Sequence, residues 1–172
     1  MAQVIHLAAP TSYPGATAAL EPAESTLVLA IRWWVADHRQ GDDPLPRLCQ
    51  ALEIAGAHDA AFAVDRLMAI IARTVRRPVA VNCPRCPNLS DDEKQLLYAA
   101  YLVQSGEAPL AERALRTAFL SAQGAEFALG SLEGITVLFG EANLVFPCRQ
   151  QPAEVVDAMM PWTPSGDART LH

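Results

Sequence analysis

The sequence predicts an all-α fold in which about six helices form a compact bundle with flexible termini. Apolar residues make up 51% of the 172 residues and charged residues 19%, a balance that can bury enough surface to offset the conformational entropy of the chain. Alanine and leucine dominate the apolar share, and both lose little freedom in a helix. Apolar side chains also recur at three- and four-residue steps, which is typical of helices with one buried face.

Three parts are expected along the chain. A flexible N-terminal arm over 1–24 and a proline-rich tail over 149–172 lack any sustained helical or strand period. The helical domain lies between them, over 25–148, and a chain of this length suits a single domain.

The first half of the domain contains three amphipathic patterns, each with its own start or stop signal. Glycine suits the left-handed residue that ends a helix, and proline suits the first helical turn. The three predicted helices start at Ser25, at Asp43-Pro44 and at Asp59, and they stop at Gly41, Gly56 and Pro78.

Ser90 and the three acidic residues after it give the strongest helix start in the sequence. The hydroxyl can cap the helix and Glu93 can return the hydrogen bond, while carboxylates in the first turn suit the positive end of the helix dipole. This fourth helix is predicted to end near Gln104, and a fifth to run from Leu110 to Gly124.

The stretch 125–146 allows two interpretations. A sixth helix followed by a short strand at 144–146 is favoured, because Ala128, Leu132 and later apolar residues keep helical spacing. The alternative is a hairpin in which 135–139 pairs with 144–146. With the hairpin, the order of elements would match a winged-helix DNA-binding protein.

The formal net charge of −6, from 13 basic and 19 acidic residues, opposes binding to a phosphate backbone. Arg73, Arg76 and Arg77 are the nearest approach to a basic patch. They are interpreted as the solvated end of the third helix, where positive charge suits the dipole. Nucleic acid is therefore not an expected partner.

A cytoplasmic location without membrane association is predicted. No apolar run approaches the roughly 18 to 20 residues needed to cross a bilayer, and the absence of Lys or Arg before Arg32 argues against a secretory signal. The four cysteines are then interpreted as reduced thiols or metal ligands rather than as a disulfide framework.

One motif points to chemistry, the run Cys83-Pro84-Arg85-Cys86-Pro87. Two cysteines separated by two residues can direct both sulfurs at one tetrahedral metal ion, and the run resembles half of a zinc-ribbon or rubredoxin-type knuckle. Pro87 stands where such knuckles usually have glycine, and the sequence holds no second pair of this spacing. Zinc is the cofactor that this pair would bind.

A complete zinc site needs further ligands. Cys148 is the candidate third ligand, because a minimal two-stranded element that pairs 79–82 with 144–146 would bring it close to Cys83. Cys49 is a poorer candidate, because it shares a predicted apolar helix face, where free cysteine behaves as a small hydrophobe.

The same pair allows two other interpretations. Neighbouring thiols can form a reversible disulfide, so Cys83 and Cys86 could make the protein a thiol redox sensor. Alternatively, Pro84 and Pro87 stiffen a connection and the thiols are incidental. The sequence leaves zinc binding, redox chemistry and this structural role open.

The sequence contains no other catalytic constellation. The four histidines are scattered, and there is no P-loop, dinucleotide fingerprint or nucleophile elbow. A non-enzymatic interaction or regulatory module is therefore favoured, one that binds another protein or a second copy of itself. A zinc-binding protein, a redox sensor and a winged-helix DNA-binding protein are the alternatives.

Trp33 and Trp162 are the candidate partner-binding residues. Trp34 belongs to the apolar stripe of the first helix, and consecutive helical residues point about 100° apart, so Trp33 is expected to face away from the core. Trp162 lies in the tail beside Met159 and Met160. A tail with a few large apolar side chains can dock into a groove.

Overall fold

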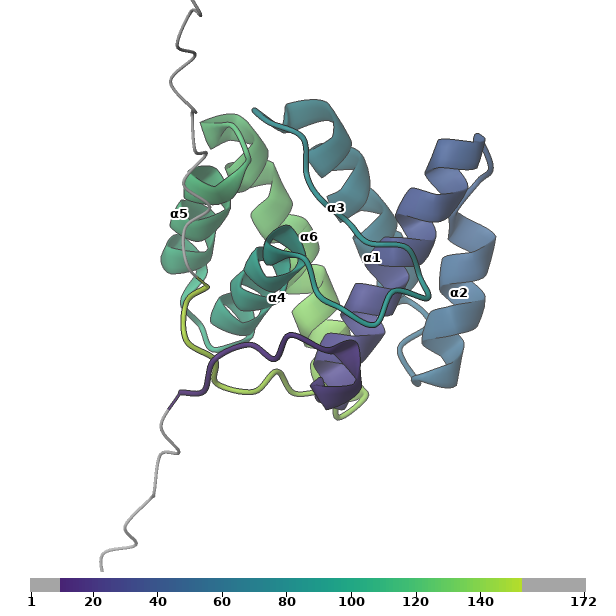
Figure 1. Cartoon of the computed structure of the whole chain (residues 1–172), viewed down its shortest axis with the longest axis horizontal. Coiled ribbons are helices and arrows are strands. Elements are labelled where there is room, and N and C mark those ends of the chain that lie inside the picture. The colour runs from purple at the N-terminus through teal and green to yellow at the C-terminus, as the bar shows by residue number, and fades with distance from the viewer. Residues whose placement is uncertain (1–9, 153–172) are drawn as a thin grey trace, which may run out of the picture.

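Six α-helices confirm the all-α fold (Figure 1). The computed structural model describes residues 10–152, and within that range it contains a short 3₁₀ helix in addition and no β-strand. The elements are η1 (Thr17–Ala19), α1 (Pro22–Gln40), α2 (Leu45–Ile54), α3 (Ala60–Thr74), α4 (Asp91–Gln104), α5 (Ala108–Ala118) and α6 (Ala122–Glu141).

Local signals fix most helix ends close to where the sequence predicts them. The Ser90 hydroxyl accepts a hydrogen bond from the Glu93 backbone N–H (3.1 Å), and the Glu93 carboxylate accepts one from the Ser90 N–H (2.8 Å). This is the predicted capping box, which satisfies two backbone donors that the first helical turn leaves free. Gly41 ends α1 in the left-handed conformation, with a φ of 79°.

α3 and α6 pack along each other at the centre of the molecule and join two groups of helices. α1 and α2 lie on the α3 side, and α4 and α5 lie on the α6 side (Figure 1). α2 packs against α1 and α3 at the edge of the bundle. This edge position leaves the outer faces of α1 and α2 accessible.

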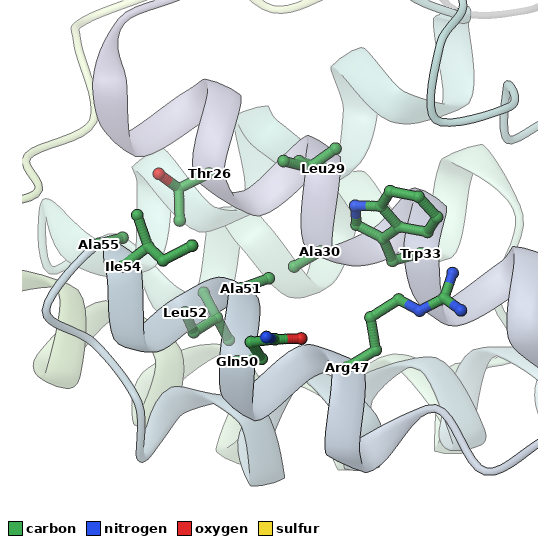
Figure 2. A pocket seen from close by; sticks show the side chains of 10 residues that line it. All are labelled: Thr26, Leu29, Ala30, Trp33, Arg47, Gln50, Ala51, Leu52, Ile54 and Ala55. Atoms are coloured by element: carbon green, nitrogen blue, oxygen red, sulfur yellow. The ribbon is translucent and has the colours of Figure 1, made fainter.

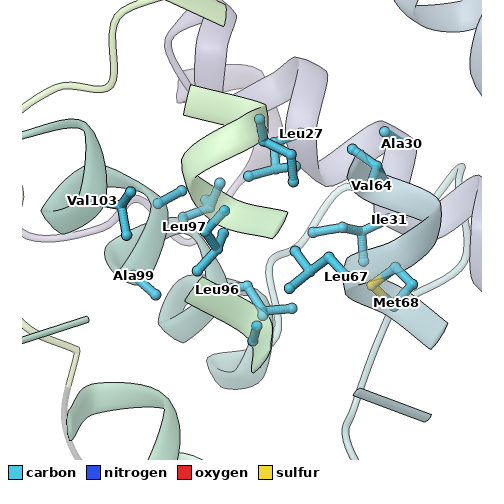
Figure 3. Packing of buried hydrophobic residues seen from close by; sticks show 14 of the residues in the cluster. Leu27, Ala30, Ile31, Val64, Leu67, Met68, Leu96, Leu97, Ala99 and Val103 are labelled. Carbon is cyan, nitrogen blue, oxygen red and sulfur yellow. The ribbon is translucent and has the colours of Figure 1, made fainter. Parts of the chain in front are cut away.

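The hydrophobic core lies between the two groups of helices. In Figure 3, Leu27 and Ile31 of α1 meet Leu67 of α3 and two leucines of α4, Leu96 and Leu97. All five side chains are almost completely buried. Burial of a side chain of this size stabilises a fold by about 1.5 to 3 kcal/mol, so these positions fix how the helices sit.

The predicted two-stranded element of 79–82 and 144–146 does not form. Asp92 accepts a hydrogen bond from the Ala80 N–H at the start of α4 (2.6 Å), whereas Gln104 accepts one from the second segment at the end of α4 (2.7 Å). Asp92 and Gln104 are 12 positions apart, which is about 18 Å along a helix. The two segments are therefore held at opposite ends of α4 by side chains.

α6 runs without a break from Ala122 to Glu141, which confirms the helical interpretation of that stretch and contradicts the hairpin. Leu132 and Ile135 are fully buried on one face, as their helical spacing predicts. The segment 144–146 has no regular secondary structure and pairs with no strand among residues 10–152. Without a hairpin, the described part of the chain does not have the winged-helix topology.

The packed unit extends past the predicted lower limit of the helical domain. α1 begins at Pro22 rather than at Ser25, because Glu21 and Glu24 form a second reciprocal cap. Further upstream, the Thr17 N–H donates to a carbonyl oxygen of the α3–α4 connection (2.7 Å). The described part of the predicted N-terminal arm is therefore bound to the bundle.

The packed unit also extends past 148, the predicted upper limit of the helical domain. Arg149 forms an ion pair with the buried Glu24 carboxylate (2.7 Å), and the Gln150 N–H donates to the Thr11 carbonyl oxygen (2.9 Å). The rest of the predicted arm and tail, over 1–9 and 153–172, lies outside the described residues.

Two of the three arginines near the end of α3 lie past the helix and bind other parts of the bundle. Arg77 forms a salt bridge with Asp92 at the start of α4 (2.6 Å) and donates to the Ala118 carbonyl oxygen (2.9 Å). Arg76 donates to the Leu120 carbonyl oxygen (2.8 Å). Both side chains therefore tie the end of α3 to the connection between α5 and α6.

Candidate functional site

A hollow with a volume of about 490 Å³ opens between α1 and α2 (Figure 2). Small residues where the helices approach, such as Ala30 and Ala51, leave room for larger side chains around the rim. Seven of its ten lining residues are apolar. The lining residues are Thr26, Leu29, Ala30 and Trp33 of α1 and Arg47, Gln50, Ala51, Leu52, Ile54 and Ala55 of α2. We call this feature the α1/α2 groove.

The rim of the α1/α2 groove carries large apolar side chains in contact with water. Ile54, at the end of α2, is 88% exposed, and Leu29, on the outer face of α1, is 41% exposed. Figure 2 shows Leu29 and Ile54 on opposite sides of the hollow. A cluster of exposed apolar side chains around a concavity is typical of a surface that binds a protein.

Trp33 lies at one end of the groove and is half-buried, whereas Trp34 is buried in the core. The Arg47 guanidinium lies over the Trp33 ring, 4.6 Å from the ring centroid, at a distance where a cation is attracted to the face of the ring. Arg47 also forms an ion pair with the buried Asp37 carboxylate (3.2 Å). These contacts hold the indole ring in one orientation in the groove.

Trp162, the other predicted partner-binding residue, lies outside the described residues. Its docking into a groove therefore stays a prediction.

The cysteine pair forms a second candidate site, a tight turn in the connection between α3 and α4. The Cys86 N–H donates to the Cys83 carbonyl oxygen (3.0 Å), so the two cysteines are the first and last residues of a β-turn with Pro84 and Arg85 at its centre. Cys83 is exposed, and Cys86 is half-buried. We call residues 83–86 the cysteine turn.

A buried ion pair anchors the cysteine turn to the bundle. The side chains of Arg32 in α1 and Glu93 in α4 are 2% and 0% exposed, and their closest approach is 2.7 Å. Arg32 also donates to the carbonyl oxygens of Cys86 and Asn88 (2.7 Å each). The hydrogen bond with Glu93 raises the pKa of Arg32, an effect that burial partly opposes, so the guanidinium stays charged beside the turn.

The four cysteines lie in different surroundings. Cys148 is exposed and accepts a hydrogen bond from the Tyr101 hydroxyl (3.1 Å), and this bond raises the pKa of the Tyr101 phenol. Cys49 is half-buried against the core. Among residues 10–152, no three side chains of the His, Cys, Asp or Glu type lie together in a way that could hold a metal ion. The structure therefore does not unite Cys148 with the cysteine turn.

Neither a family model nor a curated protein nor a solved structure matches the chain. Functional inference therefore depends on the two sites themselves and not on the fold, since one fold can serve many functions. In the described part of the chain, each helix is either too short or too polar to span a bilayer.

Several residues of the two sites were not predicted from the sequence. Arg32 interrupts an apolar run and signals a buried pair, since a charge at such a position must find a partner, but the sequence does not show that Glu93 is that partner. Leu29 and Ile54 could not be recognised, because exposed apolar residues are common on protein surfaces, and nothing local in the sequence pairs Arg47 with Trp33. Only the packing of α1 against α2 brings them together.

Proposed function

We propose that the protein is a protein–protein interaction module and that the α1/α2 groove is its binding surface. The occupant to which we commit is the α1/α2 surface of a second copy of the chain. The observation that carries the proposal is Ile54, an apolar side chain 88% exposed beside a mostly apolar hollow of about 490 Å³.

The surface is suited to self-association because it carries both a projection and a hollow. A two-fold contact places the same patch of each subunit against the other. A side chain that projects from the patch must therefore fit a hollow on that same patch. Ile54 and Leu29 supply projecting apolar groups, and the space beside Trp33 and Ala51 supplies the receptor. Two copies related by a two-fold axis can thus bury Ile54 reciprocally.

The charge distribution supports the same occupant. The chain carries a formal net charge of −6, which makes two copies repel each other over most of their surfaces. None of the ten residues that line the α1/α2 groove carries a carboxylate, and Arg47 is the one charged member of this set. A contact through the groove therefore avoids direct opposition of acidic side chains.

A cytoplasmic location is part of the proposal. It is supported by the four cysteines of the chain, all of which are free thiols, since exposed thiols persist in reducing compartments.

The proposal is tested by measuring the mass of the full-length protein in solution as a function of concentration, by sedimentation under reducing conditions. We expect a reversible dimer, and we expect Ile54→Glu to weaken dimerisation at least about tenfold, because two carboxylates would be buried in the apolar contact. Val137→Glu is the matched control. Val137 is 60% exposed on α6 and lies away from the groove lining, so this variant should dimerise like the wild-type protein.

Three outcomes overturn self-association through the groove. The wild-type chain stays monomeric at about 100 μM, above typical weak dimer constants; both variants dimerise equally; or a photoreactive group placed at Ala51 crosslinks a different protein in cells and no second copy. The last result would assign the α1/α2 groove to a heterologous partner.

A further inference from the structure

The backbone of the cysteine turn suits a disulfide between its two ends. The first and last α-carbons of a β-turn lie within about 7 Å of each other, and disulfides join residues whose α-carbons are about 4.4 to 6.8 Å apart. Pro84, at the second position of the turn, restricts the backbone to the φ that this turn requires. The α-carbons of Cys83 and Cys86 are therefore close enough for a disulfide while the fold stays as it is.

The connection is held on both sides of the turn. The Asn82 side chain donates to the Asn88 carbonyl oxygen (2.8 Å), and the Leu89 N–H donates to the Gly15 carbonyl oxygen (2.9 Å). Arg32 holds the Cys86 carbonyl oxygen from inside the bundle (2.7 Å). These bonds fix the ends of the turn, so the backbones of the two cysteines stay near each other and the thiols do not have to meet by chance.

The two thiols differ in their access to solutes. Cys83 is exposed and Cys86 is half-buried. The exposed Cys83 is therefore the thiol that a solute reaches first, and Cys86, three positions later at the other end of the turn, is placed to react next.

We propose that the cysteine turn is a redox site in which Cys83 and Cys86 exchange with a low-molecular-weight disulfide such as oxidised glutathione and close to an intrachain disulfide. The site needs no ligand from elsewhere in the chain, which a metal site at the same pair would require. It goes beyond the proposed interaction function and does not depend on it.

The exchange balances in two steps. The Cys83 thiolate attacks one sulfur of oxidised glutathione, a mixed disulfide forms, and the first glutathione thiolate leaves. The Cys86 thiolate then attacks the Cys83 sulfur, the Cys83–Cys86 bond forms and the second glutathione thiolate leaves. Two cysteine thiols are oxidised by two electrons, one glutathione disulfide is reduced, and the two thiol protons end on the two glutathione thiolates.

The test equilibrates the full-length reduced protein, with a chelator and without oxygen, in glutathione buffers of increasing oxidised fraction. Samples are quenched with acid, alkylated and digested with trypsin, and the masses of the fragments are measured by mass spectrometry. Trypsin can cleave after Arg85, between the two cysteines, so an internal disulfide keeps the two fragments joined until it is reduced. We expect Cys83 and Cys86 to become inaccessible to alkylation together. The joined fragments should have a mass two hydrogens below the sum of the two unalkylated, reduced fragments.

Three variants separate this site from ordinary thiol oxidation. Cys86→Ser should stop the exchange at a glutathione adduct on Cys83. Pro84→Ala should lower the equilibrium constant for disulfide closure about two- to fivefold, because the open turn gains backbone freedom. Cys148→Ser should leave the closure unchanged, because Cys148 is exposed and lies apart from the turn.

The proposal is overturned if Cys83 and Cys86 stay fully alkylated in buffers that convert Cys148 to a mixed disulfide, or if they take up glutathione independently. It is also overturned if native mass spectrometry before chelation shows one zinc ion bound per two chains and this zinc protects the thiols. Each of these results can occur while the α1/α2 groove still mediates self-association, so failure of one proposal is distinguishable from failure of the other.

Discussion

At the scale of single residues, the fold depends on charges placed where the sequence is most apolar. Arg32 directly follows Ile31 and lies five positions after Leu27, in the most buried part of α1. Removal of a charge from water costs several kcal/mol, which only a well-formed pair offsets. Glu93 supplies that pair with both carboxylate oxygens, and the same oxygens accept hydrogen bonds from the Ser90 and Asn82 backbones.

Glu93→Gln should therefore destabilise the protein by about 3 to 5 kcal/mol, the usual cost of removing one partner of a buried pair. The amide keeps the shape of the side chain but leaves the Arg32 charge without its counter-ion. Urea unfolding followed by far-ultraviolet circular dichroism measures the change.

The matched control is Asp91→Asn, two positions earlier in the same helical turn. Asp91 pairs with Lys94 (2.7 Å) while its own side chain is 64% exposed, so its loss should cost at most about 1 kcal/mol. Equal losses for the two variants would contradict the role given to the buried pair.

At the scale of helices, α6 packs against α3 through a glycine that cannot be enlarged. A β-carbon added at Gly124 would lie 2.5 Å from the Thr74 β-carbon, which is part of the rigid stem of that side chain. Gly130, two turns later on α6, has open space at the same position, with no atom within 4 Å. The two glycines thus differ in packing while sharing one helix.

Gly124→Ala should destabilise the protein by about 1 to 3 kcal/mol, because the end of α3 must move away from α6. Gly130→Ala should instead stabilise it by up to about 1 kcal/mol, because alanine favours the helical backbone. Thermal unfolding of both variants measures the difference. A stabilised Gly124→Ala variant would show that the end of α3 is free to shift.

Features encoded within a few residues could be predicted from the sequence. The six helices, the capping box at Ser90 and the helical nature of 125–141 follow from local spacing and local hydrogen bonds, which a short window contains. The burial of Trp34 and the outward position of Trp33 follow from the same spacing.

Features that depend on contacts between distant residues could not be predicted. The segments 79–82 and 144–146 each have a strand-like pattern, but Asp92 and Gln104 bind their backbones at opposite ends of α4. The capping box and the helix dipole account for the acidic residues after Ser90 within one helical turn, but Asp92 and Glu93 also bind arginines 15 and 61 positions away. Nothing local in the sequence assigns those partners.

At the scale of the whole molecule, the two ends of the described chain form a clasp next to the start of α1. Thr11 and Arg149 lie side by side as a parallel bridge, and Arg149 reaches the buried Glu24. The Tyr13 ring lies below the Arg149 guanidinium, 5.7 Å from ring centroid to Cζ. Burial raises the pKa of the Tyr13 phenol above its ordinary value of 10.0, as expected for a hydroxyl covered by the clasp.

A fragment of residues 10–152 should therefore be more stable than the 25–148 fragment that the sequence suggests, by about 3 kcal/mol or more. The shorter fragment lacks Tyr13, Leu20 and the Arg149–Glu24 pair, and burial of one large side chain alone is worth about 1.5 to 3 kcal/mol. Urea unfolding of both fragments measures the difference, and equal midpoints would mean that the clasp adds nothing to the bundle.

The pH dependence of the longer fragment gives an independent check on the clasp. Folded Tyr13 keeps its proton above about pH 10, where unfolded tyrosine loses it, so the folded state binds more protons and the free energy of unfolding falls as pH rises. The stabilisation from the neutral phenol is fully present below about pH 10 and is lost above it. Tyr98 and Tyr101 also have raised pKa values, but they occur in both fragments. We therefore expect the free energy of unfolding to fall more steeply above about pH 10 in 10–152 than in 25–148, and this difference reports on Tyr13. Parallel losses in the two fragments would place the Tyr13 hydroxyl in water.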